Sequence, residues 1–128
     1  MPPRLTLRVD LGTGQSVGPG KIRLLEAVAE SGSISSAGRD LGMSYRRAWL
    51  LIEQMNQSFR RKVVSTQLGG SHGGGAQLTP FGAELVKRYR TIEEKAAAAA
   101  KTHIDFLAKA SRADAATATP AKRTRLSR

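Results

Sequence analysis

Apolar residues recur with two different periods in the first third of this 128-residue chain. Between Leu5 and Leu11 every second residue is apolar, which is the pattern of a strand with one buried face. From about Gly20 to Ser31 the apolar positions recur every three or four residues, which predicts an amphipathic helix. Gly32 follows as the residue that would end this helix in a left-handed conformation.

Two shorter helices joined by a tight turn are predicted next, the first over about residues 35–41 and the second over about residues 44–59. Ser35 and Ser44 stand where a side-chain hydroxyl caps the first backbone N–H groups of a helix. Gly42 falls in the turn, where a positive φ is needed. The pattern is that of a helix-turn-helix.

The second of these helices has one apolar and one polar face. Its apolar stripe consists of Ala48, Ile52, Met55 and Phe59. Its opposite face carries Arg46, Arg47, Leu50, Gln54 and Gln57. A helix-turn-helix places the first turn of its second helix in the major groove of DNA, where Tyr45, Arg46 and Arg47 would reach base edges. A helical hairpin with a solvated arginine face is the alternative interpretation.

A small β hairpin is predicted after the basic run Arg60, Arg61 and Lys62. Its strands are residues 63–68 and 77–79, and its tip is the glycine-rich loop GGSHGGGA, residues 69–76. Such a wing lies against the sugar-phosphate backbone or enters the minor groove. A nucleotide-binding loop fits less well, because no Gly-Lys-Ser/Thr follows. His72 is expected to face solvent or phosphate, since one histidine cannot form a metal site.

Thr79 and Pro80 predict the start of a long helix, because a hydroxyl N-cap followed by proline favours helix initiation. Apolar residues then recur in alternating steps of four and three, the heptad pattern of a coiled coil, to about Ala110. A helix of roughly thirty residues spans roughly 45 Å, so we expect a second copy of the chain to cover it. A single helix packed on its own domain is the alternative. The predicted dimer interface consists of Leu85, Tyr89, Ile92, Ala96, Ala99, His103 and Phe106.

The charge balance favours a polyanionic partner. The chain has 21 Lys and Arg against 10 Asp and Glu, a net charge of +11, so double-stranded DNA is the first candidate. No long apolar run or signal-peptide core is present, and we expect a cytoplasmic protein with no membrane partner. The chain has no cysteine and no catalytic set at usable spacing, so we expect no enzyme, no metal and no cofactor.

The length allows one domain and tails. We assign residues 1–110 to a mainly α winged helix-turn-helix with a small β wing, of which residues 79–110 form the dimerisation helix. Residues 111–128 have almost nothing to bury, so we expect a disordered basic tail. Its basic residues would add non-specific phosphate contacts.

These segments resemble the N-terminal DNA-binding domain of the ModE family of molybdate-responsive transcriptional regulators, which is itself similar to the winged helix of LysR-type regulators. The resemblance covers about Leu5 to Leu107 and rests on the motifs SGSIS, GMSYRRAWLLIEQMNQ, LGGSHGGG and LTPFG. It implies a dimer formed through the long helix, with DNA contacts from the serine-rich turn, the recognition helix and the wing. Together with the charge pattern, it gives these predicted DNA-contacting residues: Ser33, Ser35, Ser44, Tyr45, Arg46, Arg47, Leu50, Arg60, Arg61, Lys62, Gly70, Ser71, His72, Gly73 and Gly74.

Two departures from the family pattern limit which properties of the family we expect of this chain. Full-length members continue into an oxyanion-binding module, which this chain is too short to hold, so direct molybdate sensing is not carried over. Ser65 and Thr66 stand where acidic and basic side chains are common in the family, so a backbone contact there is expected to be missing. We therefore expect a dimeric regulator that reads a pseudo-palindromic operator. A non-specific architectural protein and a partner-binding adaptor are the alternatives.

Overall fold

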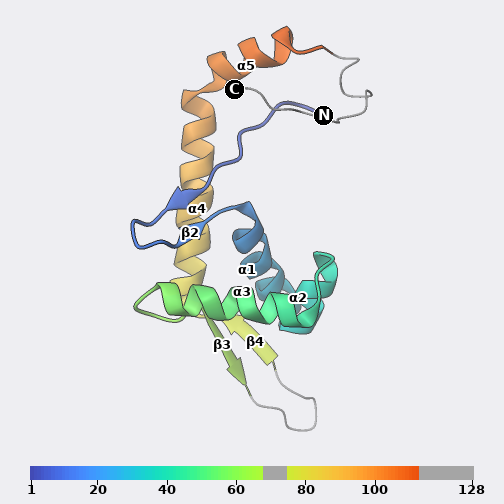
Figure 1. The fold of residues 1–128 in the computed structure, drawn as a ribbon, viewed down its shortest axis with the longest axis vertical. Coiled ribbons are helices and arrows are strands. Elements are labelled where there is room, and N and C mark those ends of the chain that lie inside the picture. Colours follow the sequence, from blue (N-terminus) through green and yellow to red (C-terminus); the bar gives the residue numbers. More distant parts are fainter. Residues whose placement is uncertain (68–74, 113–128) are drawn as a thin grey trace. The chain divides into compact units, whose positions relative to one another are not determined.

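The computed structural model describes residues 1–67 and 75–112 (Figure 1). Two compact units are present, one of residues Thr6–Glu94 and one of residues Met1–Leu5 together with the chain from Lys95 onward. The larger unit holds three helices, two short hairpins and the first part of a fourth helix, so the mainly α fold with a small β wing is as predicted. In chain order the elements are β1 (Val9–Asp10), β2 (Ser16–Val17), α1 (Pro19–Ser31), α2 (Ile34–Asp40), α3 (Tyr45–Ser58), β3 (Val64–Gln67), β4 (Gly75–Leu78), α4 (Pro80–Ala99) and α5 (Lys101–Ala110).

The core of the larger unit is formed where α1, α2 and α3 pack together above the wing hairpin β3–β4 (Figure 1). Helix α1 contributes the largest share, because four of its side chains are buried. Burying such aliphatic side chains is the main source of stability in a unit of this size. The residues with the largest fully buried side chains are Ile22, Leu24, Leu25, Val28, Met55, Val63 and Val64.

The prediction of a strand from Leu5 to Leu11 is largely wrong. Only Val9 and Asp10 form a strand, and they pair antiparallel with β2 in the register Val9 to Val17. Strand β2 ends two residues before α1 begins, so there is no partner for a longer β1. The carbonyl of Leu7 accepts a hydrogen bond from the Tyr89 hydroxyl instead, at 2.7 Å.

The first helix of the helix-turn-helix begins earlier than predicted. Its N-cap is Ser33, whose Oγ accepts a hydrogen bond from the Ser36 backbone N–H at 3.0 Å, and Ser35 lies within the first turn. Ile34, the first residue after this cap, and Ala37 are both buried. The prediction of Ser35 as the N-cap is therefore wrong.

The turn and the second helix are confirmed. Gly42 has a φ of 71°, and the Oγ of Ser44 accepts a hydrogen bond from the Arg47 N–H at 3.1 Å. Helix α1 likewise ends as predicted at Gly32, whose φ is 73° and whose N–H donates to the Val28 carbonyl at 2.8 Å. Each of these caps satisfies a backbone group that the helix itself leaves without a partner.

The wing strands β3 and β4 pair antiparallel, with Val64 opposite Leu78. The second strand starts at Gly75, two residues before the predicted segment. The backbone N–H of Ala76 in β4 donates to the carbonyl of Gly32 at 3.0 Å, which joins the wing to the end of α1.

The start of α4 is confirmed at Thr79 and Pro80. Thr79 Oγ1 accepts from the Gly82 N–H at 2.9 Å and donates to the Lys62 carbonyl at 2.6 Å. The Thr79 N–H donates to the Val63 carbonyl at 3.0 Å. The threonine therefore caps α4 and ties it to the strand that leads into the wing.

The prediction of one unbroken helix from Thr79 to about Ala110 is wrong, because the helix is interrupted at Ala100. The backbone there has a φ of −97° and a ψ of 4°, and α5 begins at Lys101. Neither glycine nor proline marks this position, and nothing in the described residues explains the interruption.

An arginine on α4 links this helix to α1 within the larger unit. Arg90 on α4 makes a two-bond ion pair with Glu26 on α1, at 2.9 and 2.8 Å, and a third bond to Glu93 at 2.7 Å. The hydrogen bond from Arg90 holds the pKa of Glu26 below its usual range. Because both side chains are about two-fifths exposed, the pair adds modestly to stability.

Candidate nucleic-acid interface

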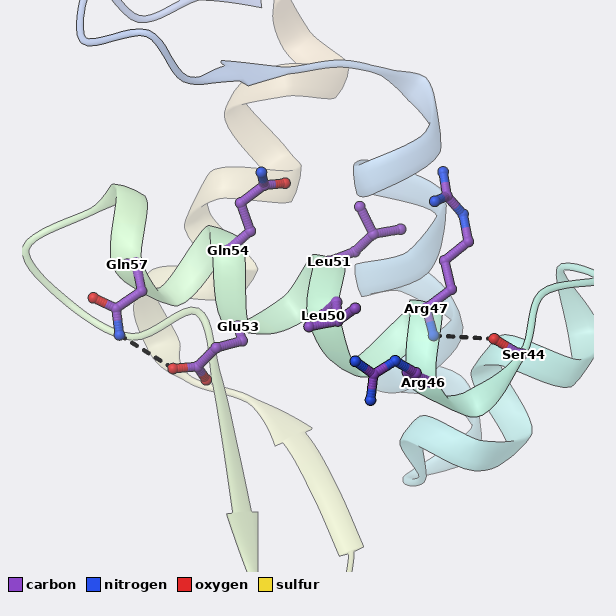
Figure 2. Close-up of a pocket in the computed structure, with 8 residues that line it drawn as sticks. All are labelled: Ser44, Arg46, Arg47, Leu50, Leu51, Glu53, Gln54 and Gln57. Carbon is purple, nitrogen blue, oxygen red and sulfur yellow. Dashed lines mark hydrogen bonds between the residues drawn. The ribbon is translucent and has the colours of Figure 1, made fainter.

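Helix α3 buries one face and presents the opposite face to solvent. Ala48, Ile52 and Met55 are buried, as the apolar stripe predicted. The exposed side is the wall of an open hollow, and Figure 2 shows the side chains that line it. They are Ser44, Arg46, Arg47, Leu50, Leu51, Glu53, Gln54 and Gln57.

The first turn of α3 carries three of the predicted DNA-contacting side chains. Tyr45 is 57% exposed, and Arg46 and Arg47 are exposed as well. Within residues 1–67 and 75–112, neither arginine forms an ion pair. Ser44 fixes the backbone of this turn through its bond to the Arg47 N–H, so both guanidinium groups extend from a rigid base (Figure 2). Leu50, 47% exposed, follows one turn later.

A second hollow lies between α3, the start of α2 and the wing strands. It brings the predicted residues Ser33, Ser35 and Tyr45 together with β3 and β4. It also contains Trp49, which the prediction missed and which is 42% exposed. Trp49 lies four residues after Tyr45, so helical spacing could have placed both aromatic rings on one side of the helix.

The basic run follows α3 at its C-terminal end. Arg60, Arg61 and Lys62 are all exposed. The guanidinium of Arg61 lies 5.2 Å from the ring centre of Phe81, which in turn meets the Phe59 ring edge-on at 5.4 Å. A cation over an aromatic face is attracted by the ring quadrupole, so Arg61 is held in place more firmly than its neighbours.

The predicted wing tip lies outside the described residues, as does the tail from residue 113 onward. This applies to Gly70, Ser71, His72, Gly73 and Gly74. In the part of the chain that is described, no set of three or more metal-binding side chains is close enough to hold an ion. None of the described helices is both long and apolar enough to cross a membrane.

The residues predicted to form the dimer interface on α4 and α5 differ in how far they are exposed. Tyr89 is only 2% exposed and its hydroxyl is bonded to the Leu7 carbonyl, so it belongs to the core of this chain and its assignment to a dimer interface is wrong. Leu85 is half-buried against the same core. Ile92 and Phe106 are 45% and 70% exposed. Of the other predicted interface residues, Ala99 and His103 are exposed and Ala96 is half-buried.

Comparison with known families identifies this arrangement. The family model described as bacterial regulatory helix-turn-helix protein, lysR family, matches residues 20–83, which run from α1 to the first turn of α4. The chain belongs to this lysR family of regulators. It carries a helix-turn-helix DNA-binding domain.

Several curated relatives of this lysR-family chain are named for molybdenum. The molybdenum-pterin-binding protein MopB of Rhodobacter capsulatus is 43% identical over 81 residues, which cover 63% of this chain and 30% of MopB. The molybdenum transport protein ModE of Azotobacter vinelandii is 41% identical over 90 residues, covering 70% and 33%. The DNA-binding transcriptional dual regulator ModE of Escherichia coli K12 is 42% identical over 76 residues, covering 59% and 29%. The chain thus spans about a third of the length of these relatives and is related to ModE regulators.

A solved structure supports the fold of this lysR-family chain. The crystal structure of a CbnR_DBD–DNA complex superposes with a TM-score of 0.51 at 21% identity, covering 66% of this chain and 91% of that one. The winged helix-turn-helix fold predicted from the sequence is confirmed by this likeness and by the family match.

Proposed function

We propose that this chain is a dimeric transcriptional regulator that reads a pseudo-palindromic operator with two copies of α3. The observation that carries the proposal is the first turn of α3, where Ser44 fixes the backbone and Tyr45, Arg46 and Arg47 extend into solvent. Arginine can bind guanine with two hydrogen bonds in the major groove. A two-fold axis would place the two helices in grooves about one helical turn, or a multiple of it, apart.

Arg46→Ala should weaken binding to the operator by about tenfold to a hundredfold, because a lost base contact costs about 1–3 kcal/mol. Removal of residues 113–128 should lower binding to all duplexes alike, because their lysine and arginine side chains attract phosphates without reading bases. Footprinting on a selected operator and on random duplex measures both. If the two changes reduced binding equally on every sequence, the chain would not read an operator.

The second copy is proposed to pair through Ile92, Ala96, Ala99, His103 and Phe106. Support comes from Phe106 and Leu107, which are 70% and 66% exposed on α5 and would lose contact with water in a dimer. Phe106→Asp should therefore give a monomer in light scattering, because a charge replaces an apolar contact. Phe106→Leu, which keeps the contact apolar, should remain dimeric. A wild-type chain that is monomeric without a partner would favour the adaptor function.

The names of the relatives support operators in molybdenum or molybdate metabolism. Selecting bound sequences from a random duplex pool, with and without molybdate, would identify those operators. Enriched sites that lie outside molybdenum genes would contradict this part of the proposal.

A non-specific architectural DNA-binding protein is the second candidate. The net charge of +11 and the exposed run Arg60 to Lys62 favour it, because phosphate contacts supply most non-specific affinity. A ratio near one between affinities for genomic sites and random duplex would support this function over operator reading.

A further inference from the structure

One half-buried carboxylate, Glu53, lies on the same side of α3 as Arg46. Arg46, Leu50, Glu53 and Gln57 follow one another at steps of four, three and four, so they form one stripe along the helix. Figure 2 shows Arg46, Leu50 and Glu53 projecting from the same side. Glu53 is the only acidic residue between Tyr45 and Ser58. Because this side of the helix would face DNA phosphates, an acidic group there opposes binding to any duplex.

The position of Glu53 is held by its neighbour. Gln57 donates a hydrogen bond from Nε2 to Oε2 of Glu53, at 3.1 Å (Figure 2). This bond occupies one carboxylate oxygen and leaves Oε1 with its lone pairs for a donor outside the protein. Glu53 forms no ion pair with the residues that the structure describes. The arrangement is an oriented, negatively charged acceptor beside two cationic donors, Arg46 and Arg47.

We propose that Glu53 is a specificity-determining residue, which accepts a hydrogen bond from the N4 amine of a cytosine in the major groove, with Gln57 as its positioning residue. The inference rests on the proposed operator-reading function. Cytosine is the base that offers a lone amine donor in the major groove, and a carboxylate is its matching acceptor. The negative charge of Glu53 weakens binding to any duplex, and the hydrogen bond to cytosine offsets this loss at one base pair only.

The geometry also sets a spacing. Glu53 lies seven positions after Arg46, which is about 10 Å along a helix axis. For a helix axis parallel to the duplex axis, this length corresponds to about three base-pair steps. A guanine read by Arg46 and the cytosine read by Glu53 should therefore lie about three base pairs apart in each half-site.

Glu53→Gln in the full chain tests the inference, with Glu94→Gln as the matched control, since Glu94 is exposed on α4 and undergoes the same charge change. Glu53→Gln should bind random duplex about twofold to threefold more tightly at low salt, and this gain should disappear at high salt. Selection from a random duplex pool should show that the wild-type chain requires one cytosine that Glu53→Met no longer requires, because methionine has no acceptor oxygen, whereas the amide oxygen of glutamine can still accept from the N4 amine. Glu94→Gln should select the wild-type site.

A modified base tests the contribution of the cytosine 4-amino group alone. Replacing that cytosine with the 2-pyrimidinone nucleoside, which lacks only the 4-amino group, should weaken the wild-type chain about tenfold and Glu53→Met much less. Gln57→Met should reduce discrimination at this position and no other. Identical selected sites for Glu53→Met and the wild type would overturn the role of Glu53 while leaving operator reading intact. A wild-type chain that enriches no sequence would overturn the proposed function itself.

Discussion

Gly82→Ala should lower the free energy of unfolding by about 3 kcal/mol or more. A Cβ built on Gly82 would lie 2.0 Å from the carbonyl oxygen of Val63 and 2.9 Å from its carbonyl carbon. Both are backbone atoms in the buried entry to the wing, so no side-chain rotation relieves the clash. Overpacking alone costs about 1–3 kcal/mol, and moving α4 away would also break the bonds of Thr79 to Lys62 and Val63. Urea denaturation followed by circular dichroism measures the change.

Gly20→Ala is the control for this substitution. Gly20 is exposed in the first turn of α1, and a Cβ there would meet no atom within 4 Å. Alanine favours the helix over glycine by up to about 1 kcal/mol, so this variant should be neutral or slightly stabilised. If Gly82→Ala were as stable as Gly20→Ala, the close approach of α4 to Val63 would not contribute to the fold.

Asn56→Leu should lower the free energy of unfolding by about 2–4 kcal/mol. The Asn56 side chain bonds to strand β3 much as a neighbouring strand would. Its Oδ1 accepts from the N–H groups of Val63 and Val64 at 2.7 and 3.2 Å, and its Nδ2 donates to the Val64 carbonyl at 3.3 Å. Val63 and Val64 are buried, so leucine would leave their backbone groups without partners or water.

Two further variants separate the parts of this effect. Asn56→Asp keeps both acceptor interactions but removes the donor. Its free energy of unfolding should therefore lie between those of the wild type and Asn56→Leu. Gln54→Leu, on the exposed side of the same helix, should change stability by less than about 0.5 kcal/mol. Thermal unfolding of the three variants measures the order. Equal losses in Asn56→Leu and Gln54→Leu would show that the bonds to β3 are not needed.

Features set by adjacent residues could be predicted from the sequence. The caps at Ser44 and Thr79 and the turn at Gly42 depend on backbone groups only a few residues away, so the pattern of hydroxyls, proline and glycine was sufficient. The N-cap of α2 was missed by two residues because serines stand at 31, 33, 35 and 36. Burial of Ile34 decides among them, and burial depends on the packing of α1.

Features set by distant residues could not be predicted. Tyr89 fits the heptad pattern, but its partner is the carbonyl of Leu7, 82 residues earlier, and periodicity does not distinguish a core of the same chain from a second copy. Asn56 gave no signal because its partners are backbone groups beyond the end of its helix. Trp49 and Glu53 were not among the residues predicted to contact DNA, although each lines a hollow beside α3.

Gly32 connects three elements through the backbone groups of one residue. Its N–H closes α1, its carbonyl receives the Ala76 N–H of wing strand β4, and Ser33, the next residue, caps α2. A pull on the wing would therefore be transmitted to both helices without a hinge between them.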